Sequence, residues 1–132
     1  MSTTNSLADT LIRRIAAGSK TIGSGATKYL HIDSGTEGAE IIGIAVKGIV
    51  GADWTVDLYI PAEDGAAACA AADKRDSVEY NSGDSEGGHL GPFAVPYDMY
   101  LDFTNDSGGS DDIDEVLILY RSSAALTLTW ET

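Results

Sequence analysis

The chain has 132 residues, 43% of them hydrophobic, which fits one folded domain with its own core. Its 21 acidic residues against 8 basic ones give a formal net charge of −13, and the few Lys and Arg residues are spread out, which argues against a nucleic-acid partner. The single cysteine, Cys69, excludes an internal disulfide and a metal cage of several cysteines.

The charge is divided unevenly along the sequence. Residues 1–50 hold five basic and four acidic residues, whereas residues 51–132 hold three basic and seventeen acidic ones. A near-neutral first part on a strongly acidic body suggests that one end docks on a partner while the rest faces solvent. The longest run of small apolar residues, 66–72, is too short to span a bilayer, so we expect a soluble protein made inside a cell, with no membrane partner.

Residues 1–18 are the first predicted element, a short helix or an extended arm. Four apolar residues recur there at helical spacing, although so short a stretch has little internal support as a helix. In either form the apolar stripe needs a cover, and the two neighbouring arginines would meet carboxylates of a partner. The expected docking residues are Leu7, Leu11, Ile12, Arg13, Arg14 and Ile15.

Residues 19–132 are predicted to form a single β-sandwich domain. Apolar and polar residues alternate, as in half-buried strands, within 29–32, 42–46, 54–60, 99–103 and 126–130. In the second of these segments the alternation places Ile42, Ile44 and Val46 on one face.

Three further segments complete the prediction. Residues 113–120 are apolar on both faces and are expected to be a central strand. Residues 61–91, with room for one short alanine-rich helix, and 104–112 are expected to be polar loops. Many short strands with little helix indicate an all-β fold, an antiparallel β-sandwich or jelly roll.

We expect a protein that is not an enzyme, because no catalytic constellation stands out. Residues 83–87 match the nucleophile-elbow spacing, but a glycine-rich stretch follows where that motif needs a helix. The two histidines, His31 and His89, have no partner at a recognisable spacing for general-base or zinc chemistry. His31 alternates with Tyr29 and Asp33 along one strand face, so we expect it at the surface.

The strongest ligand signal is an acidic loop that follows residue 104. Calcium prefers about six to eight oxygen ligands from a loop that folds around it, and this loop offers carboxylates, an amide and two glycines. The spacing is not that of an EF-hand, and the alternative is a solvated acidic loop without an ion. The candidate calcium ligands are Asn105, Asp106, Asp111, Asp112 and Asp114. No other cofactor is expected.

Aromatic residues raise the alternative of a sugar-binding surface. Trp54 and Trp130, with Tyr97 and Tyr100, supply rings that could stack on a sugar. Both tryptophans fall on the apolar phase of their strands, so we expect them in the core. A carbohydrate-binding module or receptor-binding tip with calcium is the function that an exposed aromatic row would indicate.

Four segments set the layout of the chain: an apolar N-terminal stretch, two early strands and a closing strand. They are Leu7 to Ala17, Thr27–Asp33, Trp54–Ile60 and Leu126–Trp130. In size and layout the chain resembles the small jelly-roll decoration, or cement, proteins on the capsids of tailed viruses. Tail or turret components built on similar sandwiches fit nearly as well.

The resemblance implies a structural protein of the virion surface, made in the host cytoplasm. It implies homo-oligomers such as trimers, bound to the major capsid protein or another virion protein. The low lysine content with abundant Asp, Ala, Gly and Thr is typical of proteins from salt-loving organisms, where salt screens a dense carboxylate surface. A virus of a halophilic host is therefore suggested, and an acidic protein from an ordinary environment is the alternative.

Overall fold

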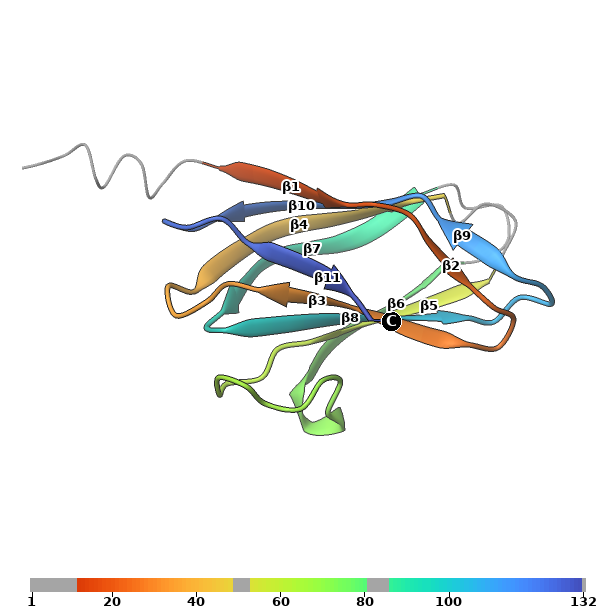
Figure 1. The fold of residues 1–132 in the computed structure, drawn as a ribbon, viewed down its shortest axis with the longest axis horizontal. Helices are drawn as coiled ribbons and strands as arrows, with labels where there is room; N and C mark the ends of the chain where they lie inside the picture. The colour runs from red at the N-terminus through yellow and green to blue at the C-terminus, as the bar shows by residue number, and fades with distance from the viewer. Residues whose placement is uncertain (1–11, 49–52, 81–85, 132) are drawn as a thin grey trace, which may run out of the picture.

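Two antiparallel sheets lie face to face in the computed structural model, which describes residues 12–48, 53–80 and 86–131 (Figure 1). One sheet has four strands, in the order β1 (Arg13–Ala17), β10 (Glu115–Arg121), β4 (Ala39–Lys47) and β7 (Glu86–Val95). The other has five, in the order β11 (Thr127–Trp130), β3 (Thr27–Asp33), β8 (Asp98–Asn105), β5 (Trp54–Tyr59) and β6 (Lys74–Tyr80). Two short strands, β2 (Lys20–Ile22) and β9 (Asp111–Ile113), pair with each other at one end.

Eight of these strands are connected as a jelly roll. The first, β1, pairs with the last of the eight, β10, while β3 pairs with β8, β4 with β7 and β5 with β6. This nested pairing across two sheets is the jelly-roll connection. β11 then adds a fifth strand beside β3. The predicted all-β sandwich is confirmed.

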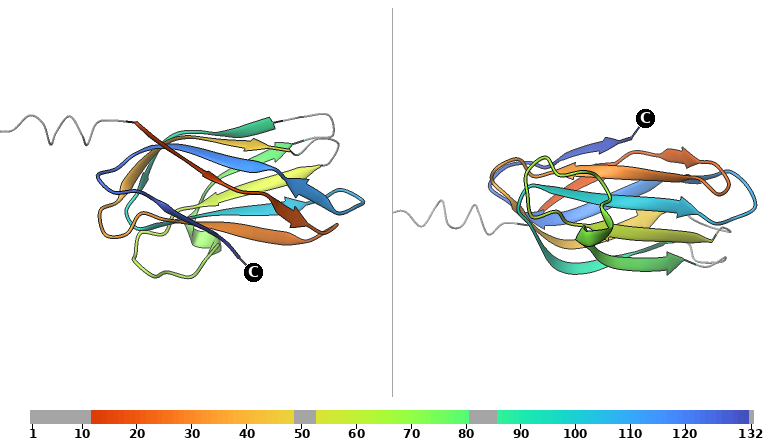
Figure 2. Two further views of the ribbon diagram at one scale, coloured as in Figure 1. Left: turned by 45° about the horizontal axis from the view of Figure 1, so that its top comes forward. Right: turned by 90° about the horizontal axis from the view of Figure 1, so that it is seen from below.

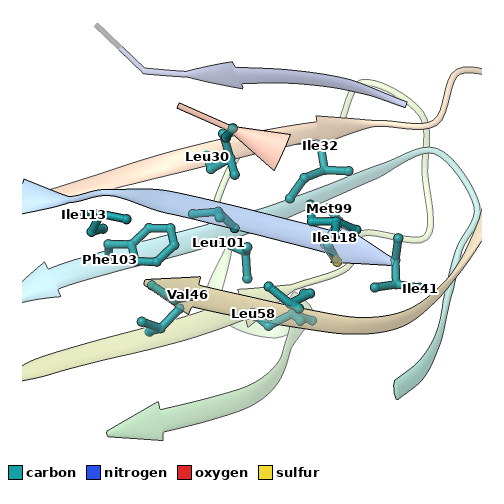
Figure 3. Close-up of a cluster of buried hydrophobic side chains, with 14 of the residues drawn as sticks. Leu30, Ile32, Ile41, Val46, Leu58, Met99, Leu101, Phe103, Ile113 and Ile118 are labelled. Atoms are coloured by element: carbon teal, nitrogen blue, oxygen red, sulfur yellow. The ribbon is translucent and has the colours of Figure 1, made fainter. Parts of the chain in front are cut away.

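The core fills the space between the sheets (Figure 3). Strand β8 supplies Met99, Leu101 and Phe103, all fully buried, because alternate residues of a strand point to the same face. Trp54 is 1% exposed, as its position in the strand pattern predicts. Trp130 is partly buried, and its ring packs 5.3 Å from that of Phe103.

The N-terminal helix is a wrong prediction for the part of it that the structure describes. Arg13–Ala17 form β1, which pairs with β10 at all five residues. Ile15 packs against the core and Ala17 is buried within it, and these two residues, two apart, have strand spacing. Pairing with β10 therefore overrides the helical pattern. Leu7 and Leu11 lie outside the described residues.

Strands β6, β7 and β9 lie wholly or partly where polar loops were expected. Residues 61–91 include β6 and part of β7, and the expected alanine-rich helix is reduced to a single 3₁₀ turn, Ala71–Asp73. β6 is rich in charged residues and β7 contains three glycines and a proline, which are typical of turns, so neither sequence shows a clear apolar alternation. The described part of the chain contains no helix with the length and hydropathy needed to cross a bilayer.

A bulge changes the inward face of β4. The register with β7 shifts between Ile41 and Gly43, so Ile41 is buried in line with Ile44 and Val46, and Ile42 is partly exposed. The prediction that Ile42 shares the buried face is wrong for this reason. The prediction of a central strand near the C-terminus is confirmed, since β10 lies between β1 and β4.

Candidate functional site

The outer faces of the two sheets differ in character. Residues that alternate with the buried ones in β3, β8, β5 and β6 point outward, and many of them are acids. This acidic face, together with Glu131 just after β11, comprises Asp33, Asp57, Glu79, Asp98, Asp102 and Glu131.

The outer face of the four-stranded sheet has small and apolar residues at its middle and charged residues toward its ends, among them the pairs Glu115–Lys47 and Arg121–Glu40. Cross-strand pairs Ala16–Leu117 and Leu117–Ala45 lie beside the pair Leu119–Gly43. Leu119 is 37% exposed, and Ile12, in phase with Ala16 just before β1, is 56% exposed. We call this surface the apolar face and define it by Ile12, Ala16, Gly43, Ala45, Leu117 and Leu119.

Asp102 lies near the middle of the acidic face, opposite Tyr29 on one side and Asp57 on the other. Partial burial, followed by the charges of Asp57 and Glu131, raises the pKa of Asp102 to about 6, although Lys74 acts in the opposite direction. The Lys74 ammonium reaches the face as a counter-charge, with its Nζ 3.3 Å from Asp57 Oδ1.

The segment that joins β5 to β6 covers part of the acidic face (Figure 2, right). The Gly65 N–H donates to Asp98 Oδ2 at 3.3 Å, and the Tyr100 hydroxyl donates to the carbonyl of Ala66 at 3.4 Å. Tyr59 and Tyr100 point outward from the sheet but are buried by this cover. Burial, more than the nearby carboxylates, raises the pKa of both tyrosines.

Cys69 in the same segment is held as a neutral thiol. Burial is the main cause, with the charges of Asp102, Glu131 and Asp57 adding to it, and together they raise the pKa of Cys69 to about 12. A thiol with so high a pKa is a poor nucleophile at neutral pH. A shallow pocket of about 170 Å³ in the segment between β5 and β6 is lined by Pro61, Ala62, Glu63, Ala66 and Asp73.

A histidine and two aspartates meet at one end of the acidic face. His31 Nε2 lies 2.8 Å from Asp98 Oδ1, and the His31 ring stacks on Tyr100 with 4.8 Å between centroids. Asp33 faces Asp98 directly across the β3–β8 pair. One ligand atom from each of the three residues lies within 4.8 Å of the others, and within the described ranges this is the only such group of three His, Cys, Asp or Glu residues.

Sequence reasoning found part of this cluster. His31 and Asp33 were recognised as neighbours on one strand face, and His31 is partly exposed as expected. Asp98 was missed because only the register of β3 against β8 brings it to them. The alternation of Asp98, Tyr100 and Asp102 with apolar residues predicts that these three side chains share the outward face of their strand. It does not predict which strand pairs with this one.

The candidate calcium ligand Asn105 has a structural role. Its side chain is fully buried, and its Nδ2 donates to the carbonyls of Ile22 and Gly109, each at 2.9 Å. Its Oδ1 accepts hydrogen bonds from the backbone N–H and the hydroxyl of Ser107. Asn105 therefore ties the loop to β2 and folds it back on itself.

The other calcium candidates are engaged at different places. Asp106 Oδ2 accepts from the Thr55 hydroxyl at 3.0 Å, whereas Asp112 Oδ1 accepts from the Thr21 hydroxyl at 2.6 Å, on the short β2–β9 ribbon. Asp111 Oδ1 accepts from the Asp112 N–H. The backbone N–H of Asp114 donates to the carbonyl of Lys47. The structure does not bring these carboxylates together, and calcium binding there stays a prediction.

The expected docking residues are also divided. Ile15 packs against the protein's own core and is not available to a partner, whereas Ile12 and Arg14 are exposed. Arg13 donates from Nη2 to the carbonyl of Ser123 at 3.4 Å, beyond the far end of β10. Of the residues named for docking, the described part of the chain therefore leaves Ile12 and Arg14 most open to a partner.

No protein-family model matches the sequence, and no curated protein sequence matches it significantly. Among solved structures, the chain is similar to the Yersinia pseudotuberculosis-derived mitogen, with a TM-score of 0.54 and 14% identity over 87% of this chain and 91% of the mitogen. That likeness shows a shared fold.

The chain also aligns with VP2 of infectious bursal disease virus. The VP2 subviral particle gives a TM-score of 0.43 and 12% identity over 90% of this chain and 36% of that one. The structure of the Gt strain gives a TM-score of 0.43 and 12% identity over 92% of this chain and 38% of that one. The chain thus spans little more than a third of these viral chains.

Proposed function

We propose that this protein is a non-enzymatic structural component of a virion, a decoration protein that docks on the capsid and turns its acidic face to solvent. The observation that carries the proposal is the contrast between the two outer faces. In a chain of net charge −13, the middle of one sheet face is apolar, with Leu119 at its centre and Ile12 at its margin. An exposed apolar patch on so polar a protein indicates a contact surface.

The apolar face is suited to a flat, close contact. Its residues include Gly43, Ala16 and Ala45, whose small side chains let another backbone approach. Burial of Leu119 or Ile12 against a partner would contribute roughly 1.5–3 kcal/mol each, before the cost of ordering the contact. Arg14 and Lys47 project from the same face and could meet carboxylates of a partner.

In the absence of a capsid, the protein can use this face only to bind other copies of itself. We propose a homo-oligomer, a trimer in the simplest case, since repeated copies on a lattice gain attachment strength from multivalency. The residues upstream of β1, which include Leu7 and Leu11, continue the chain from Ile12 at the margin of the apolar face and are proposed to add to the contact.

Light scattering of the full chain tests the docking face. We expect a discrete oligomer for the natural sequence and a monomer for Leu119→Lys, since a second cation directly opposite Arg14 cannot be buried without a partner charge. Thr127→Lys adds the same charge at an exposed position of β11, in the other sheet, and should leave the oligomer intact. A monomer at every concentration, or an oligomer that survives Leu119→Lys, would reject this face as the interface.

Cosedimentation with capsids that lack the protein tests the partner. Deletion of residues 1–11 removes the proposed docking segment without touching β1, whereas a longer deletion would also remove a strand of the sheet. We expect the shortened chain to lose capsid binding and to keep its far-ultraviolet circular dichroism spectrum. Full binding by the shortened chain would contradict docking through the N-terminal region.

The described residues give no support to the sugar-binding alternative. That function needs an exposed row of aromatic rings, but Trp54 and Tyr100 are buried. Trp130 packs on Phe103, and its indole N–H donates to the carbonyl of Gly18 at 2.9 Å. These rings serve packing rather than a platform.

A further inference from the structure

We infer that His31, Asp33 and Asp98 form a binding site for one divalent transition-metal ion of the zinc class. The three side chains come from two adjacent strands, β3 and β8, at the end of the acidic face nearest the β5–β6 segment. They lie in the sheet opposite the apolar face, so the site is independent of the proposed docking function.

The spacing of the ligand atoms suits a small ion. Zinc binds imidazole nitrogen and carboxylate oxygen at about 2.0–2.2 Å in a tetrahedral arrangement, which places neighbouring ligand atoms about 3.3 Å apart. One ligand atom from each residue lies within 4.8 Å of the other two, and His31 Nε2 and Asp98 Oδ1 are 2.8 Å apart. A bound ion would replace the direct His31–Asp98 contact and move these two atoms apart by about 0.5 Å.

The two carboxylates give a separate reason to expect a cation. Asp33 and Asp98 are direct cross-strand partners, and like charges at such positions repel each other. Asp98 is only 5% exposed, so water screens its charge poorly. A divalent ion would neutralise both carboxylates, whereas the neighbouring imidazole can offset one at most.

The surroundings hold the ligands in place. The Gly35 N–H donates to Asp33 Oδ1 at 2.7 Å, and the Gly65 N–H donates to Asp98 Oδ2 at 3.3 Å. Each carboxylate thus has one oxygen fixed by a backbone amide, and the other oxygen of Asp98, Oδ1, contacts His31 Nε2, the atom with which it would share the ion. The stacked Tyr100 ring, inclined by 17°, fixes the plane of His31. Such outer contacts orient the ligands of natural metal sites.

The ligand set selects among metals. Calcium prefers about six to eight oxygen ligands and magnesium a near-octahedral oxygen shell, neither of which one imidazole and two carboxylates supply. Imidazole with carboxylate suits zinc, copper or nickel. Three protein ligands leave a fourth position for water or for a donor from another molecule.

Titration calorimetry with zinc chloride tests the site on the full chain, after treatment with a chelator and its removal. We expect one zinc ion per chain, and binding about tenfold weaker or more in His31→Gln and in Asp33→Asn. His89→Gln is the matched control, since it removes the other histidine of the chain, and its affinity should equal that of the natural sequence. Cobalt in place of zinc should give the visible absorption of a tetrahedral complex.

Two outcomes would overturn the inference. The first is a natural chain that takes up no zinc while its circular dichroism spectrum shows it folded. The second is equal zinc binding by the natural chain, His31→Gln and Asp33→Asn, which would assign the ion to scattered surface carboxylates. Asp33→Asn keeps the test decisive if His31→Gln fails to fold, because Asn preserves the size of the side chain.

Discussion

The ionised carboxylate of Asp102, on the acidic face, destabilises the folded protein. Its pKa in the folded protein, about 6, lies above the ordinary value of 3.8, so folding disfavours the ionised carboxylate. The resulting loss of stability is absent below about pH 4, grows between pH 4 and 6 and is complete above pH 6. The charge therefore opposes folding at neutral pH and ceases to do so in acid.

Asp102→Asn should accordingly stabilise the protein at pH 7. We expect the free energy of unfolding to rise by about 1 kcal/mol, a value reduced from the full shift because the group is partly exposed and screened by solvent. The difference from the natural sequence should disappear near pH 4, as urea unfolding at both values would show. Glu79→Gln removes one charge from an exposed position of the same face, and an equal gain there would assign the effect to net charge rather than to burial.

Individual strands could be predicted wherever apolar and polar residues alternate along the strand itself. The alternation in β5 and β8 reveals both their type and their buried face, Trp54 and Phe103 included. β6 and β7 were missed because β6 is rich in charged residues and β7 contains three glycines and a proline. In β4 the bulge places Ile41, rather than Ile42, on the buried face. The His31–Asp98 contact depends on which strands pair, and that is decided by the packing of the whole sandwich.

The bulge makes β7 sensitive to one glycine. A Cβ on Gly91 would collide with the carbonyl oxygen of Ile41, a backbone atom that cannot turn aside. We expect Gly91→Ala to lower the free energy of unfolding by about 2–3 kcal/mol, measured by urea unfolding. Gly108→Ala is the control: a Cβ there meets nothing within 4 Å, and its effect should stay within about 0.5 kcal/mol. Equal effects from the two substitutions would show that the close approach does not matter.

For the whole molecule, the concentration of acids on one face makes stability depend on salt. Salt at about 0.15 M, where the Debye length is about 8 Å, screens exposed charges that are farther apart than this, and closer pairs are screened as the Debye length falls to about 3 Å at 1 M. We expect the free energy of unfolding in urea to rise with KCl through this range. A continued rise well beyond about 1 M KCl would support a halophilic origin, whereas a plateau by about 1 M would identify an acidic protein from an ordinary environment. No dependence on KCl at all would contradict the role given to self-repulsion.

The pairing of β1 with β10 has a consequence for synthesis on the ribosome. β1 leaves the exit tunnel well before its partner, because about 100 residues separate Arg13–Ala17 from Glu115–Arg121. The strand must wait for this intervening stretch to be translated before its backbone groups find their partners. β4 waits as well, because its two neighbours in the sheet, β7 and β10, both come later. Closure of the nested strands is therefore a late event, governed by contacts that are far apart in sequence and slow to form.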